Sequence, residues 1–276
     1  MQPKWGSDSI RDPKLEVWRS GGLLYVILLV SVKIAIRMQT PNGKWTGLAM
    51  IELHDATKTY EQGRRVVNAV RGVTMSVAGG EFVTIMGPSG SGKSTLMHLM
   101  GALDTPSTGR AIFQGQNLQA MSDSERSLLR RTRIGFVFQA FNLLPTLTAA
   151  ENVALPLLLG GTARRLAMER AIECLRNVGL DARKDHYPEE LSGGEMQRVA
   201  VARALIADPD AVLCDEPTGN LDTATSRDIL ELLSKLPAPN RRAVILVTHD
   251  PSAAAYGTRL VKIRDGVIES DEPVRR

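Results

Sequence analysis

The stretch Val83-Thr-Ile-Met-Gly-Pro-Ser-Gly-Ser-Gly-Lys-Ser94 carries most of the information about the fold. Its first four residues are mostly apolar or β-branched, which predicts a buried strand, and a helical pattern begins at Lys93. Residues 87–94 match the pattern G-x-x-x-x-G-K-[ST] in the strand–loop–helix context that it requires. Glycines let backbone N–H groups converge on phosphate oxygens, and the helix N-terminus adds its positive end. The stretch therefore predicts a phosphate-binding loop.

A second candidate half-site lies where the apolar run 211–214 ends in two carboxylates, Asp215 and Glu216. Asp215 at a strand end would hold Mg²⁺ directly or through water, and Glu216 would act as general base on the attacking water. In the loop, Lys93 would reach the β- and γ-phosphates and Ser94 would be a ligand of Mg²⁺. The expected nucleotide-binding residues of the loop are Gly87, Pro88, Ser89, Gly90, Ser91, Gly92, Lys93, Ser94 and Thr95.

Short apolar runs alternate with longer periodic stretches after residue 50. Residues 83–86, 136–138, 211–214 and 244–247 suit buried strands, and residues 93–103, 162–178, 192–207 and 222–236 show helical patterns. Asp265-Gly266 between two apolar runs predicts a hairpin turn. This alternation predicts an α/β fold built on a mostly parallel sheet.

Composition and charge exclude several classes of protein. With 43% hydrophobic and 23% charged residues, the chain is ordinary for a globular protein, and two cysteines cannot form a disulfide framework. The net charge of +4 arises entirely in residues 1–49, while the charges of residues 50–276 balance. A nucleic-acid partner is therefore not expected, because the main domain lacks a basic surplus.

Residues 1–49 form an N-terminal extension that differs from the rest. The run Leu23-Leu-Tyr-Val-Ile-Leu-Leu-Val30 is too short to cross a bilayer as a helix and is soon interrupted by Lys33 and Arg37. Three interpretations stay open: a start site that belongs at Met50, a membrane-surface helix, or a targeting signal. We expect the nucleotide-binding domain to occupy residues 50–276.

The stretch Leu191-Ser-Gly-Gly-Glu-Met-Gln-Arg198 decides among the classes of nucleotide-binding protein. A serine cap and two glycines that open a helix make a second anion site. One nucleotide on one chain does not need two such helix ends, so this one is expected to close on a nucleotide held by another copy.

With this stretch the chain resembles the ATP-binding-cassette (ABC) ATPases, and the resemblance covers about residues 51–270. It implies a P-loop NTPase core with a mostly parallel sheet, an antiparallel β subdomain and a helical signature subdomain. It also implies ATP and Mg²⁺ as ligands and a second ATPase subunit in a homodimer. The resemblance implies that Tyr60 lies against adenine and that residues 220–222 form a loop linking the two active sites. The catalytic residues that it implies are Glu216, His249, Gln139 and Lys93, and the implied metal ligands are Ser94, Gln139 and Asp215. The signature residues that it implies on the partner's nucleotide are Leu191, Ser192, Gly193, Gly194 and Gln197.

Within this family, residues 138–145, 147–153 and 215–222 resemble the lipoprotein-release, macrolide-export and cell-division (LolD, MacB and FtsE) branch. This implies an integral membrane permease of the FtsX/MacB-like type and a peripheral location on the cytoplasmic face of the inner membrane. A regulator of the FtsE kind, which exports nothing, stays open as an alternative. Four apolar residues would either form a groove for a permease helix or pack within their own subdomain: Phe141, Leu143, Leu144 and Leu147.

Three other functions are disfavoured. A nucleotide kinase would need a second substrate pocket in place of the signature helix. A DNA-repair or chromosome-structuring ATPase would place a long coiled coil between Lys93 and Ser192, and a translation factor of this class would carry two cassettes.

Overall fold

The computed structural model describes residues 15–20, 23–30, 33–39, 45–46, 49–63, 65–237 and 241–274. The chain divides into two compact units, Met1–Ala49 and Met50–Arg276. Among the described residues, no helix is both long and apolar enough to span a membrane.

The first unit contains an antiparallel sheet with the strand order β1-β2-β3-β4. The apolar run is therefore a strand, whereas a membrane-surface helix was one of the expectations. Its composition explains the difference, because Tyr, Val and Ile favour strands and β2 is paired along both edges. The strands are β1 (Leu15–Ser20), β2 (Leu23–Val30), β3 (Lys33–Gln39) and β4 (Trp45–Thr46).

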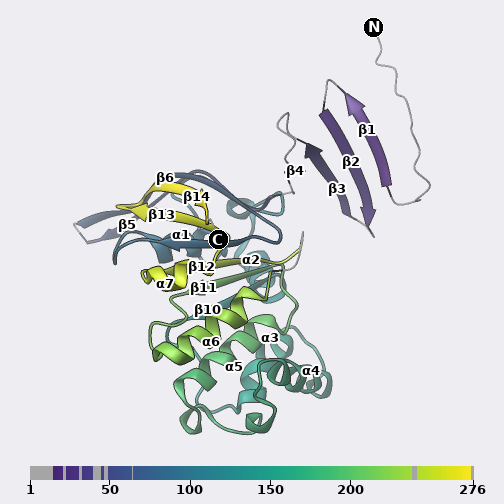
Figure 1. Cartoon of the computed structure of the whole chain (residues 1–276), viewed down its shortest axis with the longest axis vertical. Helices are drawn as coiled ribbons and strands as arrows, with labels where there is room; N and C mark the ends of the chain where they lie inside the picture. The colour runs from purple at the N-terminus through teal and green to yellow at the C-terminus, as the bar shows by residue number, and fades with distance from the viewer. Residues whose placement is uncertain are drawn as a thin grey trace. The chain divides into compact units, whose positions relative to one another are not determined.

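A six-stranded sheet with the order β10-β11-β12-β7-β13-β14 forms the centre of the second unit (Figure 1). Its first five strands run parallel, and β14 adds an antiparallel edge through the hairpin turn at Asp265 and Gly266. The predicted mostly parallel sheet and the predicted hairpin are both confirmed. The strands are β7 (Phe82–Met86), β10 (Ile134–Phe138), β11 (Ala211–Asp215), β12 (Ala243–Thr248), β13 (Arg259–Arg264) and β14 (Val267–Pro273).

A second sheet has the order β6-β5-β8-β9, with β5 antiparallel to β8 and β8 antiparallel to β9. It supplies the expected antiparallel β subdomain. Helix α1 packs in one hydrophobic core with this sheet and one face of the central sheet. The bounds are β5 (Ala49–Gln62), β6 (Arg65–Ala78), β8 (Thr108–Phe113), β9 (Gln116–Asn117) and α1 (Lys93–Met100).

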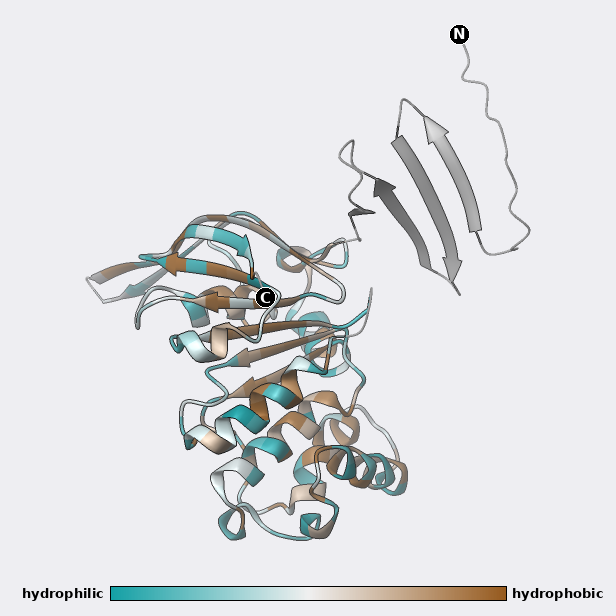
Figure 2. Cartoon of the chain, in the orientation of Figure 1, coloured by the Kyte–Doolittle hydropathy of each residue, from teal (hydrophilic) through white to brown (hydrophobic). Residues whose placement is uncertain are grey.

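Helices α3 to α6 and the other face of the central sheet enclose a second core, in which α5 lies against β10 and α4 packs on α3 and α5 (Figure 1). Alternate strand residues enter the two cores: Leu213 and Ile245 face the first, Val212 and Val244 the second. Figure 2 shows these strands mostly hydrophobic, beside helices in which hydrophobic and hydrophilic residues alternate. The remaining helices are α2 (Asp123–Thr132), α3 (Ala149–Leu159), α4 (Arg164–Asn177), α5 (Gly193–Leu205), α6 (Thr223–Ser234) and α7 (Pro251–Ala254).

Helices α2 and α3 were not predicted from hydrophobic periodicity. Both begin with a capping box, Ser122 with Glu125 and Thr148 with Glu151, in which side chain and backbone bond reciprocally. The spacing S/T-x-x-E was the signal that would have found them.

The parallel strands place the candidate site residues along one edge of the sheet. Residues 87–92 follow β7, Gln139 follows β10, Glu216 follows β11 and His249 follows β12. The carboxyl ends of parallel strands meet at the same edge, which is where ligands bind in open α/β sheets.

Candidate nucleotide-binding and catalytic site

The loop between β7 and α1 has a shape that only glycine permits at two positions. A Cβ atom at Gly87 would lie 2.1 Å from the Ile263 carbonyl oxygen, and one at Gly92 would lie 2.2 Å from that of Ala69. Gly92 also has φ +98°, in the left-handed region. The hairpin turn supports the loop, since the Gly266 N–H donates to the Ser91 carbonyl over 3.0 Å.

Two polar groups of this loop are short of partners. Lys93 is buried, and its Nζ donates to the carbonyl oxygens of Gly87 and Pro88 over 2.9 Å each. The buried Ser91 hydroxyl has no hydrogen-bond partner within the described part of the chain. A buried ammonium whose hydrogen bonds go to neutral carbonyls suits an anionic oxygen ligand such as phosphate.

A cavity of about 570 Å³ opens beside this loop. Of the predicted site residues, it brings together Ser89, Gly90, residues 92–95 and Glu216. A second cavity of about 470 Å³ shares Glu216 and adds His249. Tyr60, Gln139 and signature residues 191–194 line neither cavity.

Asp215 and Ser94 form the candidate Mg²⁺ site. The Ser94 hydroxyl donates to Asp215 Oδ1 over 3.1 Å, so the two predicted ligands are adjacent. Burial raises the pKa of the Asp215 carboxyl, and the Ser94 hydrogen bond opposes that rise. Hydroxyl and carboxylate oxygens are ligands that Mg²⁺ prefers, and Mg²⁺ is usually bound by one or two such groups together with substrate phosphates. The residues present therefore fit the ion.

We expect Asp215→Asn to raise the thermal unfolding temperature of the nucleotide-free protein. Because the pKa of Asp215 is raised, the folded state binds its proton more tightly than the unfolded state does, so the ionised carboxylate lowers the free energy of unfolding at neutral pH. Asparagine keeps an oxygen that accepts the Ser94 hydrogen bond, and it removes the negative charge of the carboxylate. Each kcal/mol gained would raise the unfolding temperature by roughly 2–4 °C.

Differential scanning calorimetry of both proteins against pH measures this effect. The advantage of the variant should disappear as the pH falls and Asp215 becomes protonated. An unfolding temperature that is unchanged or lower in the variant at neutral pH would contradict the interpretation.

Glu216 adopts a backbone conformation that the sequence did not predict. Its φ is +45°, which is uncommon for a residue other than glycine. Hydrogen bonds fix the backbone on both sides: Glu216 N–H donates to Val247 O over 2.9 Å, and Gly219 N–H donates to Glu216 O over 3.0 Å. The side chain contacts His249, whose Nδ1 lies 2.8 Å from Glu216 Oε2. The structure thus pairs the expected base with the expected γ-phosphate contact.

Gln139 joins two loops. Its Nε2 donates to Asn220 Oδ1, and Asn220 Nδ2 returns a bond to Gln139 O, each over 3.1 Å. A Cβ atom at Gly219 would lie 2.7 Å from Gln139 Nε2, so the glycine makes room for this contact. Gln139 is exposed and lines neither cavity.

The signature residues form the N-terminus of α5. Exposed Ser192 caps the helix by accepting from Glu195 N–H, and the Ser192 N–H donates to Glu195 Oε2 over 2.9 Å. Hydrogen bonds from Ser192 hold the pKa of Glu195 below its usual value. A Cβ atom at Gly194 would lie 2.4 Å from Thr225 Cγ2, so packing against α6 also requires glycine there.

Two residues of α5 make contacts that the sequence analysis did not predict. Gln197, expected to contact a partner's nucleotide, is completely buried, and its Nε2 donates to Pro217 O over 2.6 Å. Arg203, which was not singled out, donates to Phe141 O over 2.7 Å and thereby joins α5 to the loop after Gln139. The motif spacing gave no signal for either contact.

Tyr60 lies beside the first turn of α1 but outside both cavities. Its hydroxyl donates to Asp104 Oδ2 over 2.9 Å, and Lys58 Nζ lies 5.1 Å from the ring centroid. Burial and the bond to Asp104 raise the pKa of Tyr60. The ring is thus held in place by two charged neighbours.

Comparisons with known proteins agree with this geometry. The family model "ABC transporter" matches residues 70–219. The chain is 45% identical over 233 residues to the uncharacterized ABC transporter ATP-binding protein MJ0796 of Methanocaldococcus jannaschii, covering 82% of this chain and 98% of that protein. It is 48% identical over 224 residues to the macrolide export ATP-binding/permease protein MacB of Syntrophobacter fumaroxidans, covering 80% of this chain and 31% of that protein.

The chain therefore spans about a third of the length of that MacB relative and nearly all of MJ0796. Among solved structures, it is similar to a dimeric MJ0796 cassette in a post-hydrolysis state bound to ADP and Pi. The TM-score is 0.76 at 43% identity, covering 82% of this chain and all of that one. The α/β fold with its P-loop core is thus confirmed, and the chain belongs to the ABC transporter family as an ATP-binding domain of the LolD/MacB-like branch.

Proposed function

We propose that this chain is the ATP-hydrolysing subunit of a transporter and that two copies work as a head-to-tail dimer. One observation carries the proposal. Within the chain, the phosphate-binding loop and Glu216 share a cavity, whereas residues 192–194 form an exposed helix end that does not line it. A second copy would bring that helix end to the bound nucleotide, as a closed two-fold dimer allows. The similar MJ0796 structure is a dimer with ADP and Pi.

Each residue of the site has a role that follows from its position. Lys93, which lines the first cavity, would exchange its loop carbonyls for phosphate oxygens. Glu216 would accept the proton of the attacking water, and His249 would contact the γ-phosphate from its exposed ring. Mg²⁺ held by Ser94, Asp215 and Gln139 would offset the negative charge of the β- and γ-phosphates.

A third cavity supports a permease partner. It has a volume of about 400 Å³, lies between α2, β10, α3 and α5, and is lined by apolar residues that include Phe138, Leu155 and Leu159. No acidic residue lines it, but three arginines do. Each donates to a backbone carbonyl: Arg130 to Ala102, Arg131 to Leu159 and Arg203 to Phe141.

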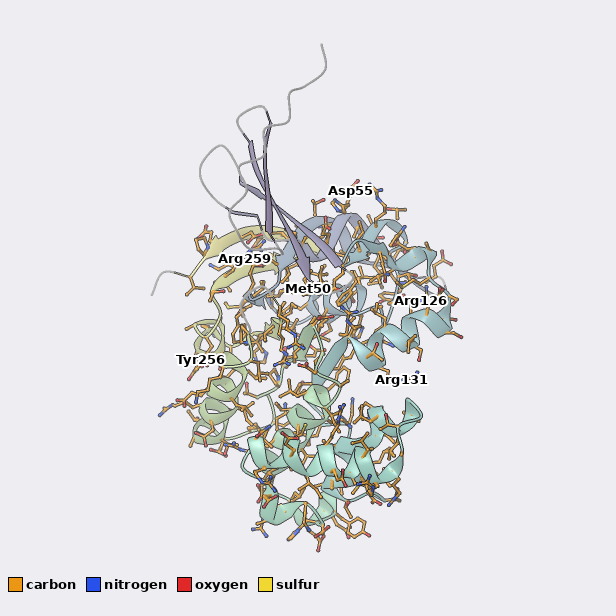
Figure 3. All side chains as sticks on the ribbon, turned by 90° about the vertical axis from the view of Figure 1, so that its right-hand side faces the viewer. Met50, Asp55, Arg126, Arg131, Tyr256 and Arg259 are labelled. Carbon is orange, nitrogen blue, oxygen red and sulfur yellow. The ribbon has the colours of Figure 1, made fainter. Side chains whose placement is uncertain are left out.

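An apolar cavity with a rim of guanidinium groups suits a helix that carries both apolar and acidic side chains. Arg131 lies where α2 comes near the helices below it (Figure 3). Of the four apolar residues considered for this surface, Leu143 packs against the core and Leu144 is 44% exposed. We place the permease contact at the third cavity and the loop that carries Leu144.

The permease would be of the FtsX/MacB-like type, and the coupled process would be lipoprotein release or export. The MacB relatives named as ATP-binding/permease proteins support a membrane partner for this domain. The chain would then lie peripherally on the cytoplasmic face of the inner membrane, with no nucleic-acid partner. Residues 50–276 would be sufficient for ATP turnover, which a chain that starts at Met50 tests directly.

We expect Leu159→Glu to abolish binding to the proposed permease partner while leaving the ATP turnover of the isolated chain unchanged. Leu159 is 66% exposed at the edge of the third cavity, and a carboxylate there would remove apolar contact area needed by a partner helix. The matched control is Leu166→Glu on α4, at a leucine that is 44% exposed and outside the cavity. Co-purification from membranes is the measurement, and retained binding by Leu159→Glu would refute this docking surface.

A further inference from the structure

Gln197 lies inside the protein at the boundary between α5 and the loop that follows Glu216. It is the fifth residue of α5 and has no exposed surface. Its Nε2 donates to Pro217 O over 2.6 Å. A carbonyl oxygen can only accept, so this bond fixes the orientation of the amide. The side chain therefore connects the signature helix directly to the residue after the expected general base.

The other end of the same amide is unpaired. Gln197 Oε1 is buried and has no hydrogen-bond partner among the residues that the structure describes. An apolar side chain of similar length would avoid burying an acceptor without a partner. An unsatisfied polar atom is therefore present where the one hydrogen bond that the side chain makes with described residues goes to Pro217 O.

The backbone at Glu216 explains what that bond holds. Its φ of +45° is strained for a residue other than glycine and persists only when the surroundings fix it. Val247 fixes the peptide before Glu216 by accepting its N–H, and Gly219 binds the Glu216 carbonyl. Gln197 fixes the next carbonyl along, at Pro217. Of the three contacts made by Val247, Gly219 and Gln197, the one made by Gln197 comes from α5.

We propose that Gln197 is a positioning residue that sets the carboxylate of Glu216 according to the position of its own signature helix. A displacement of the N-terminus of α5 moves Gln197, and Gln197 moves the peptide after Glu216. The signature helix would thereby act on catalysis within its own chain. The inference rests on the proposed role of Glu216 as general base.

Turnover number and nucleotide affinity of Gln197→Met test the proposal. Methionine fills a similar volume but cannot donate to Pro217, so we expect kcat to fall roughly 10- to 100-fold. ATP affinity should stay unchanged, because Gln197 lines neither cavity. The matched control is Arg198→Met on the same helix, which loses the bonds to Val178 O and Asp228 and leaves the bond from Gln197 to Pro217 O in place. It should retain the wild-type kcat even if the protein unfolds at a lower temperature.

Gln197→Glu provides a readout that packing alone would not change. A protonated carboxyl can donate to Pro217 O and an ionised one cannot, and burial would raise the pKa of this carboxyl above its usual value. The kcat of the variant relative to wild type should therefore fall as the pH rises.

The outcomes distinguish this inference from the function on which it rests. If Glu216→Gln is inactive and Gln197→Met has the wild-type kcat, the positioning role is refuted and the proposed base stands. If Glu216→Gln is fully active, the assignment of the base fails first. A constant ratio between Gln197→Glu and wild type across pH would also overturn the positioning role.

Discussion

Replacing Glu216 by glutamine is expected to reduce ATP turnover by about 10²- to 10⁴-fold while ATP binding persists. The amide keeps the shape of the side chain, and its oxygen can still accept from His249 Nδ1, which lies 2.8 Å from the carboxylate in the wild type. What it loses is the capacity to take a proton from water. The Ser94–Asp215 pair and Lys93 are unchanged, so the phosphate contacts remain.

A protein that binds ATP and does not hydrolyse it should accumulate as a closed dimer. Size-exclusion chromatography with ATP and Mg²⁺ would show a species of twice the mass, and phosphate release would measure the rate. Glu231→Gln, at an exposed position on α6 outside both cavities, is the matched control and should behave as wild type. Turnover of Glu216→Gln at the wild-type rate would show that another group is the base.

The second large effect is expected at Ser192. If residues 192–194 act on the nucleotide of another copy, Ser192→Arg should abolish hydrolysis by blocking that contact, while each monomer still binds nucleotide in its own loop. Lys93→Ala should instead weaken binding directly, since its Nζ lies within the loop. Loss of the helix cap alone costs about 0.5–2 kcal/mol. Ser192→Ala loses the same cap without the bulk and is therefore the control for stability.

Mixing the two inactive variants gives the sharper result. A mixed dimer contains one site with an intact loop from one copy and an intact Ser192 from the other. Random pairing makes half of the dimers mixed, so the mixture should regain roughly a quarter of the wild-type rate if the sites work independently. A mixture as inactive as its components, together with equal loss of nucleotide affinity in both variants, would place Ser192 at the nucleotide of its own chain.

The sequence alone determined the α/β core and the phosphate-binding loop, because both depend on local properties. The periodicity of strands and helices can be observed in successive residues. Gly87 and Gly92 occupy positions where another part of the backbone comes too close for a side chain. The carboxyl ends of parallel strands then bring Asp215 beside Ser94. The missed helices α2 and α3 were also within reach of sequence reasoning, through their capping boxes.

Only the tertiary structure decided how the site residues are connected. Gln197 belongs to the signature by spacing, but the packing of α5 against the loop at Pro217 turns its side chain into the interior. The left-handed backbone of Glu216, its contact with His249, and the bond from Arg203 to the loop after Gln139 likewise join residues that are distant in the chain. Such contacts depend on how helices and strands settle against one another, and no local periodicity encodes that arrangement.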